Sequence, residues 1–128
     1  LVDSLSVTRE VHFLGDRSDV RELLQGFDLF AMSSVTEGYS IALLEAAATG
    51  LPIVATAVGG NAEIAVEGVN GRIVPSGNPA RLAHAIESVL ADPVKATEMG
   101  RRSREWALVE ASVKWMRVRY RQLYESRA

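Results

Sequence analysis

Two glutamates stand eight positions apart in the stretch TEGYSIALLEAAATGLP, residues 36–52. Glu45 is surrounded by leucine and alanine, so we expect its carboxylate to be buried. Burying a carboxylate is costly unless it accepts hydrogen bonds. A sugar diol could donate such bonds from two adjacent hydroxyls, each worth about 1.5–3 kcal/mol. We therefore predict that Glu45 holds a ribose, and that Glu37 accepts hydrogen bonds from the hydroxyls of a transferred sugar.

The residues between the two glutamates are suited to bind a phosphate. Ser40 is a good helix cap, and Gly50 followed by Pro52 ends a helix, so the spacing predicts a helix over 41–49. The first backbone N–H groups of a helix lack acceptors and, together with the helix dipole, attract anions. Gly38 lets the backbone approach a ligand closely. The predicted diphosphate ligands are the amides of Tyr39, Ser40, Ile41 and Ala42.

An alternative interpretation of the same stretch is purely structural. Glu45 would then cap a neighbouring loop, and Glu37 would be an ordinary exposed acid. Spacing alone leaves both interpretations open.

The elements that would position these residues alternate between strand and helix. Short apolar runs predict buried strands over 11–15, 28–34, 52–58 and 70–76, with helices over 19–25, over 41–49 and from residue 62. Such alternation is typical of an α/β fold with a Rossmann-like parallel sheet and helices on both faces. Ligands bind at the carboxyl edge of such a sheet, where Glu37 would lie.

The last third of the chain is predicted to be helical. One helix begins at Asn78 and Pro79 and should dock an apolar stripe on the sheet; a second covers 93–108, and a third begins near Ser112. The docking stripe consists of Leu82, Ala83, Ile86, Val89 and Leu90. The third helix carries Val113, Met116, Tyr120 and Leu123 on one face.

Composition limits the class of protein. The 128 residues are 48% hydrophobic, enough for one domain with a core, and include no cysteine, which excludes disulfides and thiolate metal sites. A net charge of −2 does not suggest a nucleic-acid-binding protein, which would usually carry an excess of basic residues. No apolar run is long enough for a membrane span. We expect a cytoplasmic protein.

Basic residues exceed acidic ones from Arg101 onward. This excess predicts a solvated helix face. The alternative is attraction to a partner domain or to the inner face of a membrane.

The stretch EGYSIALLE resembles the E-x7-E motif of the retaining, nucleotide-sugar-dependent glycosyltransferases of family four, also called glycosyl transferases group 1, which have the GT-B fold. The following AAATGLPIVATAVGGNAEI is also similar to that family. So are VHFLG before the motif and GVNGRIVPSGNPARLAHAI after it. The resemblance extends from about residue 11 to about residue 124.

The resemblance implies a role for each matching position. Glu37 would contact the donor sugar, with Gly38 and Tyr39 near it; Ser40, Ile41 and Ala42 would lie near the diphosphate, and Glu45 would bind the ribose. The base would lie near residues 15–17. Gly59 and Gly60 line the same edge, either as a tight turn or in direct contact with the ligand.

The chain also departs from the family pattern. These enzymes have two Rossmann-like domains; the first carries the acceptor site, and an arginine and a lysine that neutralise the diphosphate precede the strand that VHFLG resembles. None of these is found here, so we expect residues 1–128 to be one truncated nucleotide-sugar-binding domain, inactive alone and completed by an N-terminal acceptor domain. An exposed sheet edge could also pair with a second copy.

The predicted function is that of the donor-binding part of a retaining glycosyltransferase. It would use a nucleoside-diphosphate sugar as substrate, with no cofactor and no metal, since no His/Asp cluster has ligand spacing. The alternative is a non-catalytic nucleotide-sugar-binding or interaction module. A degenerate Rossmann-like domain for another phosphate ligand is a third option, without support from a G-x-G-x-x-G sequence.

Overall fold

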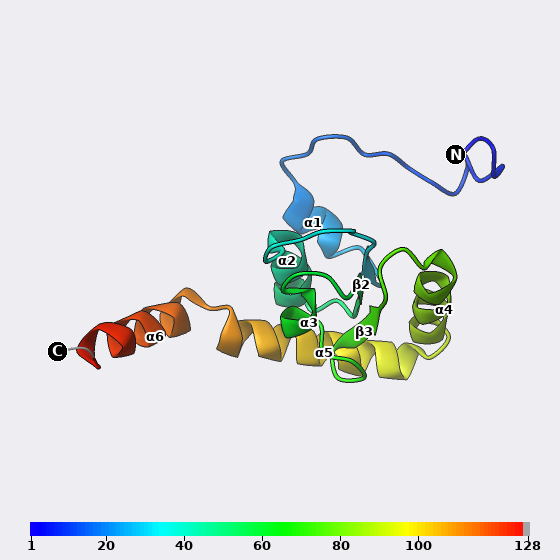
Figure 1. Ribbon diagram of the computed structural model, residues 1–128. Helices are drawn as coiled ribbons and strands as arrows, with labels where there is room; N and C mark the ends of the chain where they lie inside the picture. Colours follow the sequence, from blue (N-terminus) through cyan, green and yellow to red (C-terminus); the bar gives the residue numbers. More distant parts are fainter. Residues whose placement is uncertain (127–128) are drawn as a thin grey trace.

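The computed structural model of the protein describes residues 1–126 and contains a three-stranded parallel sheet (Figure 1). The strands are β1 (Phe30–Met32), β2 (Ile53–Thr56) and β3 (Gly71–Val74), in the spatial order β1-β2-β3. Phe30 lies opposite Ile53, and Ile53 lies opposite Gly71. All the carboxyl ends therefore meet at one edge of the sheet, as the sequence predicts.

Six helices accompany the sheet within the described residues. They are α1 (Val20–Leu24), α2 (Ile41–Thr49), α3 (Asn61–Ile64), α4 (Pro79–Leu90), α5 (Pro93–Glu110) and α6 (Val113–Glu125). The last of them extends beyond α5, away from the sheet (Figure 1). Four of them begin with a side chain that accepts a backbone N–H, which confirms the expected starts at Ser40 and Asn78. The other two such caps are Asp92 and Ser112.

The predicted strand over 11–15 is wrong. These residues form no strand; they run as an exposed segment away from α1, and Phe13 is 82% exposed (Figure 1). A strand forms only where a neighbour accepts and donates its backbone hydrogen bonds. No strand among residues 1–126 lies beside this segment. The hydrophobic run thus matched a strand in composition but has nothing to pair with.

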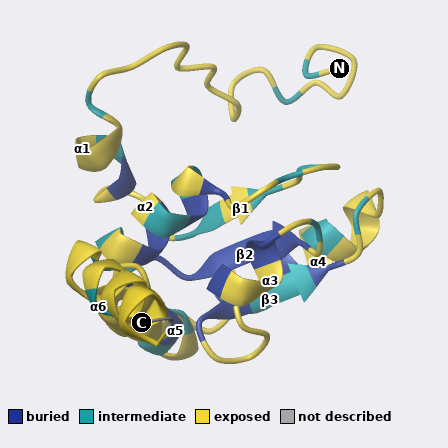
Figure 2. Ribbon diagram, turned by 60° about the vertical axis from the view of Figure 1, so that its left-hand side comes forward, coloured by how far each residue is buried: buried dark blue, intermediate teal, exposed yellow. Residues whose placement is uncertain are grey.

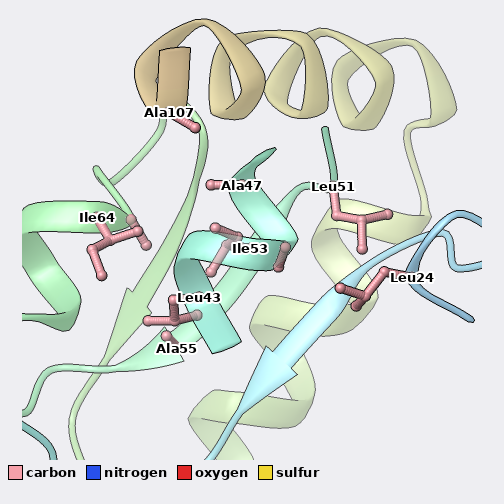
Figure 3. Packing of buried hydrophobic residues seen from close by; sticks show 10 residues of the cluster. Leu24, Leu43, Ala47, Leu51, Ile53, Ala55, Ile64 and Ala107 are labelled. Atoms are coloured by element: carbon pink, nitrogen blue, oxygen red, sulfur yellow. The ribbon is translucent and has the colours of Figure 1, made fainter. Parts of the chain in front are cut away.

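The central strand β2 holds the two faces of the sheet together. Ile53, Val54 and Ala55 are fully buried, and successive side chains point to opposite faces. Ile53 and Ala55 pack with α1, α2, α3 and the end of α5, as Figure 3 shows. Val54 packs on the other face with α4 and the first half of α5. Helices therefore cover both faces, as predicted.

The docking stripe of α4 differs in detail from the prediction. Ala85 and Val89 are buried, and Leu82 and Ile86 pack against them. Ala83 and Leu90, two of the predicted members, are exposed instead. The reason is angular: these two lie at the margins of the apolar stripe, outside the arc that meets Val54.

Helix α6 forms where predicted, but its apolar face is not covered by any described residue. Val113, Met116, Tyr120 and Leu123 are each at least 50% exposed, and Figure 2 shows most of the helix in the colour of exposed residues. No helix among residues 1–126 is both long enough and apolar enough to cross a bilayer.

Helix α5 approaches α2 through two glycines. Gly50 ends α2 in the left-handed region, with φ +92°, and Gly100 lies against it. A Cβ on Gly100 would lie 2.2 Å from the Gly50 carbonyl oxygen. Arg104, one turn further along α5, donates a hydrogen bond to the Ala48 carbonyl at the end of α2. This close crossing fixes the carboxyl end of α2 and, through it, the direction of the helix.

Replacing Gly100 by alanine should therefore lower the free energy of unfolding by about 1–3 kcal/mol, the usual cost of overpacking. The loss should occur even though alanine favours helices by about 1 kcal/mol over glycine. Urea unfolding measures the difference. The control is Gly26→Ala, where the new Cβ would lie at an ordinary 3.5 Å from the Leu23 carbonyl oxygen. A Gly100→Ala protein as stable as this control would contradict the close crossing.

Candidate functional site

Hydroxyl groups tie the carboxyl ends of the three strands to one another. The Thr56 hydroxyl, on the last residue of β2, donates to the Ser34 carbonyl oxygen at 2.7 Å. The Ser76 hydroxyl, two residues after β3, donates to the same oxygen at 3.3 Å. Ser34 lies two residues after β1, so one carbonyl oxygen connects all three strand ends. The loop that follows it, residues 35–40, begins from a fixed point.

Glu37 lies on this loop at the carboxyl edge of the sheet, where the sequence predicts it. Its side chain is half-buried, and Oε1 accepts a 2.9 Å hydrogen bond from the Ser34 hydroxyl. An ionised carboxylate has further acceptor positions on its two oxygens. The arrangement can therefore hold Glu37 in place and still leave it free to accept hydrogen bonds from hydroxyls of a ligand.

The glycine pair after β2 packs directly on this loop. The Gly60 N–H donates to the Gly38 carbonyl at 2.7 Å. Gly59 has a φ of +50°, and a Cβ there would lie only 1.9 Å from the Glu37 carbonyl oxygen. Of the two interpretations of this pair, the structure favours the tight turn. Its function is to let the backbones of residues 37–38 and 59–60 meet.

The start of α2 has the geometry of an anion site. The buried Ser40 hydroxyl accepts the Leu43 N–H at 3.3 Å, which satisfies one of the free amides of the first turn. The N–H groups of Ile41 and Ala42 receive no acceptor from residues 1–126. Ile41 is 72% exposed, so this end of the helix opens to solvent. Two open amides and the helix dipole remain for a negatively charged ligand.

Tyr39 covers the turn formed by the glycine pair. The Tyr39 ring lies so close to Gly60 that a Cβ on Gly60 would be 2.6 Å from the ring atom Cδ2. About half of Tyr39 stays exposed. Partial burial raises the pKa of the Tyr39 phenol, as do the negative charges of Glu63 and Glu110, against a smaller opposite effect of Arg119. The phenol therefore stays protonated at neutral pH and can donate a hydrogen bond.

The expectation that Glu45 is buried is wrong. Helix α2 buries Leu43, Ala46 and Ala47 against the sheet, whereas Glu45 is exposed on the opposite side. At 100° per residue, Glu45 lies well away from the direction that these three share. The alanines near Glu45 suggested burial on all sides, but some of them face outward, and Ala48 is exposed. Capping of a neighbouring loop is not seen either, because Glu45 has no side-chain hydrogen bond to any residue from 1 to 126.

Glu45 lies in a groove of about 780 Å³ along the outer side of α2. Helix α1, the second half of α5 and the junction before α6 form the other walls. The polar groups that accompany Glu45 are Arg21, Gln25, Thr49, Arg104 and Ser112. Sequence reasoning missed this set. The residues come from four separate segments, and the packing of α1 and α5 on α2 brings them together.

The segment predicted to lie near a base does not join the groove. Residues 15–17 are exposed, and Arg17 forms a bidentate ion pair with Asp19 at 2.7 and 2.5 Å. This pair raises the pKa of Arg17 and lowers that of Asp19 through the shared hydrogen bonds. Arg17 is therefore bound to its own loop in this structure.

The match to a protein family decides how this edge is interpreted. The model of the family described as glycosyl transferases group 1 matches residues 1–106. The chain belongs to this family. Among its relatives, EpsD of Bacillus subtilis, named a putative glycosyltransferase, is 34% identical over 108 residues, which are 84% of this chain and 28% of EpsD. N-acetyl-alpha-D-glucosaminyl L-malate synthase of Bacillus anthracis is 36% identical over 105 residues, 82% of this chain and 28% of that enzyme.

Solved structures of other proteins have the same fold. HepE from Anabaena, crystallised in complex with UDP, superimposes with a TM-score of 0.91 at 28% identity, over 98% of this chain and 35% of HepE. Such structural neighbours are GT-B glycosyltransferases. The chain thus spans about a third or less of the length of each of these three relatives.

In this family member, the glycine pair should be sensitive to any added side chain. Gly59→Ala should lower the free energy of unfolding by about 1–3 kcal/mol more than Gly77→Ala. Both positions have positive φ, +50° and +72°, and therefore share a backbone cost of about 1–2 kcal/mol. Only Gly59 also meets another backbone, since nothing lies within 4 Å of a Cβ on Gly77. Equal losses in urea unfolding would show that the loop of Glu37 does not depend on this contact.

Proposed function

We propose that the chain is the donor-binding part of a retaining glycosyltransferase that transfers a sugar from a nucleoside-diphosphate sugar to an acceptor. The observation that carries the proposal is the order of groups along one loop and the helix that follows it: Glu37 on its fixed loop, the open amides of Ile41 and Ala42 at the start of α2, and Glu45 one turn further along that helix, in the groove. Crystal structures of HepE in complex with UDP and with UDP-glucose support it, because that protein shares the fold of this chain.

In the proposed reaction, the amides at the start of α2 stabilise the charge that develops on the departing diphosphate. Groups that are oriented before the reaction stabilise such charge without reorganisation. Glu37 accepts hydrogen bonds from hydroxyls of the donor sugar and holds its anomeric carbon in place. No side chain on this edge is assigned as a covalent nucleophile. We therefore propose that the bond from the anomeric carbon to the diphosphate breaks and the acceptor hydroxyl attacks on the same face of the sugar, with its proton passing to the departing diphosphate oxygen.

The nucleoside would occupy the groove along α2, with its ribose hydroxyls on Glu45. A volume of about 780 Å³ lies within the range common for sites of small molecules. Arg21, Gln25 and Thr49 line the same groove and offer further hydrogen-bonding groups. Because Glu45 is exposed, its carboxylate needs no compensating partner before the ligand arrives.

The acceptor site belongs, in this proposal, to the part of the enzyme that the relatives carry beyond the region matched here. Catalytic inactivity of residues 1–128 by themselves stays a prediction, as do metal independence, a cytoplasmic location and self-association through the free edge of β1.

The excess of basic residues from Arg101 onward is best interpreted as a solvated helix face, because Arg101 and Arg102 form ion pairs with Glu98. The double pairing lowers the pKa of Glu98 to about 2. Peripheral membrane association stays a prediction.

Glu45→Gln in the full-length enzyme should weaken binding of a nucleoside diphosphate by about 1.5–3 kcal/mol, the worth of one hydrogen bond to a charged group. Stability should stay the same, because the Glu45 carboxylate is exposed and has no hydrogen-bond partner among residues 1–126 to lose. Calorimetry with UDP, GDP and ADP measures the affinity. The control is Glu87→Gln, an exposed glutamate on α4, on the other face of the sheet. Unchanged affinity for all three nucleotides would remove Glu45 from the binding site.

Glu37→Ala should lower turnover roughly a hundredfold, the scale of a misplaced reactant, while affinity for the bare nucleoside diphosphate changes little. The reason is position: Glu37 precedes the amide site and would touch the sugar rather than the phosphates. Steady-state rates with uridine, guanosine and adenosine diphosphate sugars are compared with diphosphate affinities. Equal losses in both would mean that Glu37 only supports the loop. A native protein that binds the nucleotides but turns over no donor would favour the alternative, a non-catalytic binding module.

A further inference from the structure

Ser34 connects the buried sheet to the carboxylate of Glu37. Its hydroxyl donates to Glu37 Oε1 at 2.9 Å, and its carbonyl oxygen accepts both the Thr56 and the Ser76 hydroxyls. Thr56 is 3% exposed and ends the best-buried strand. A continuous set of hydrogen bonds thus runs from the core, through Ser34, to the half-buried acid at the ligand edge.

A glutamate on a loop would otherwise be free to adopt several orientations. Three side-chain torsions separate the carboxylate from the backbone, and holding such a chain still costs side-chain entropy. An ionised carboxylate can only accept hydrogen bonds, so the hydroxyl of Ser34 must be the donor. A bond of this charge-assisted kind is about twice as strong as a neutral one. It selects one orientation of Glu37 before any ligand binds.

We propose that Ser34 is a positioning residue for sugar transfer: its hydroxyl holds Oε1 of Glu37, so that the remaining acceptor positions of the carboxylate face the hydroxyls of the donor sugar. This inference rests on the proposed function, in which Glu37 contacts that sugar. Ser34 itself touches no reacting atom. Thr56 and Ser76 fix the backbone from which its hydroxyl points.

The neighbouring serine supplies a matched control. Ser33 differs from Ser34 by one position, is exposed, and makes no side-chain hydrogen bond within residues 1–126. Ser34→Ala removes the donor, Ser34→Thr keeps a hydroxyl, and Ser33→Ala removes a hydroxyl with no contact. Each variant is made in the full-length enzyme and in a Glu37→Ala background. The native enzyme is first tested with uridine, guanosine and adenosine diphosphate sugars to find the donor that it uses. Turnover of each variant is then measured with that donor, together with nucleotide affinity and melting temperature.

We expect Ser34→Ala to lower kcat about tenfold, with nucleotide affinity within twofold of the native value. Ser34→Thr should recover most of the rate, and Ser33→Ala should behave as native. In the Glu37→Ala background, Ser34→Ala should cause no further loss, because the group it positions is gone. A merely structural role would lower the melting temperature and would persist in that background.

Two results would overturn the inference and leave the proposed function intact. One is a native rate for Ser34→Ala while Glu37→Ala is strongly impaired. The other is a tenfold loss from Ser34→Ala that remains in the Glu37→Ala background. A native rate for Glu37→Ala itself would instead overturn the role of Glu37 in the proposed function, and with it the role of Ser34.

Discussion

The candidate site depends on the close approach of two backbone segments, residues 37–38 and 59–60. The Gly60 N–H donates to the Gly38 carbonyl at 2.7 Å, and the space beside the Glu37 carbonyl oxygen admits no Cβ at Gly59. Hydrogen bonds from Thr56 at the end of β2 and from Ser76, two residues after β3, fix the other end of the loop at Ser34. The loop is therefore held at both ends, and Glu37 and the start of α2 take their positions from it.

Helix α2 connects the ligand edge to the core. Its inner side packs Leu43, Ala46 and Ala47 on the sheet, its end crosses α5 at Gly50, and its outer side presents Glu45 to the groove. Small residues suit both tasks. Alanines let the helix lie close to its neighbours, and their short side chains leave room beside Glu45 for a ligand. One element thus supplies an anion site at its start and a carboxylate one turn further along.

Local sequence signals predicted the elements well wherever a local interaction decides them. Helix starts at Ser40 and Asn78 depend on a side chain and an amide a few residues away, and both are confirmed. The strand over 11–15 depends on a neighbour that its own sequence does not specify, and it is absent. Buried polar links such as the Ser103 hydroxyl on the Asn70 carbonyl, 33 residues apart, left no signal that a periodicity could detect.

By itself the sequence determined the family, the α/β class, the position of the motif at the carboxyl edge and the open amides at the start of α2. These features follow from residue types and short spacings. The tertiary structure alone decided that Glu45 faces outward, which polar groups share its groove, and that the Ser34 carbonyl oxygen accepts hydrogen bonds from Thr56 and Ser76. The physical reason is that these depend on the angle between packed helices and on contacts between segments far apart in the chain. The leucines and alanines next to Glu45 in the sequence do not specify whether its side of the helix packs on the sheet or faces the solvent.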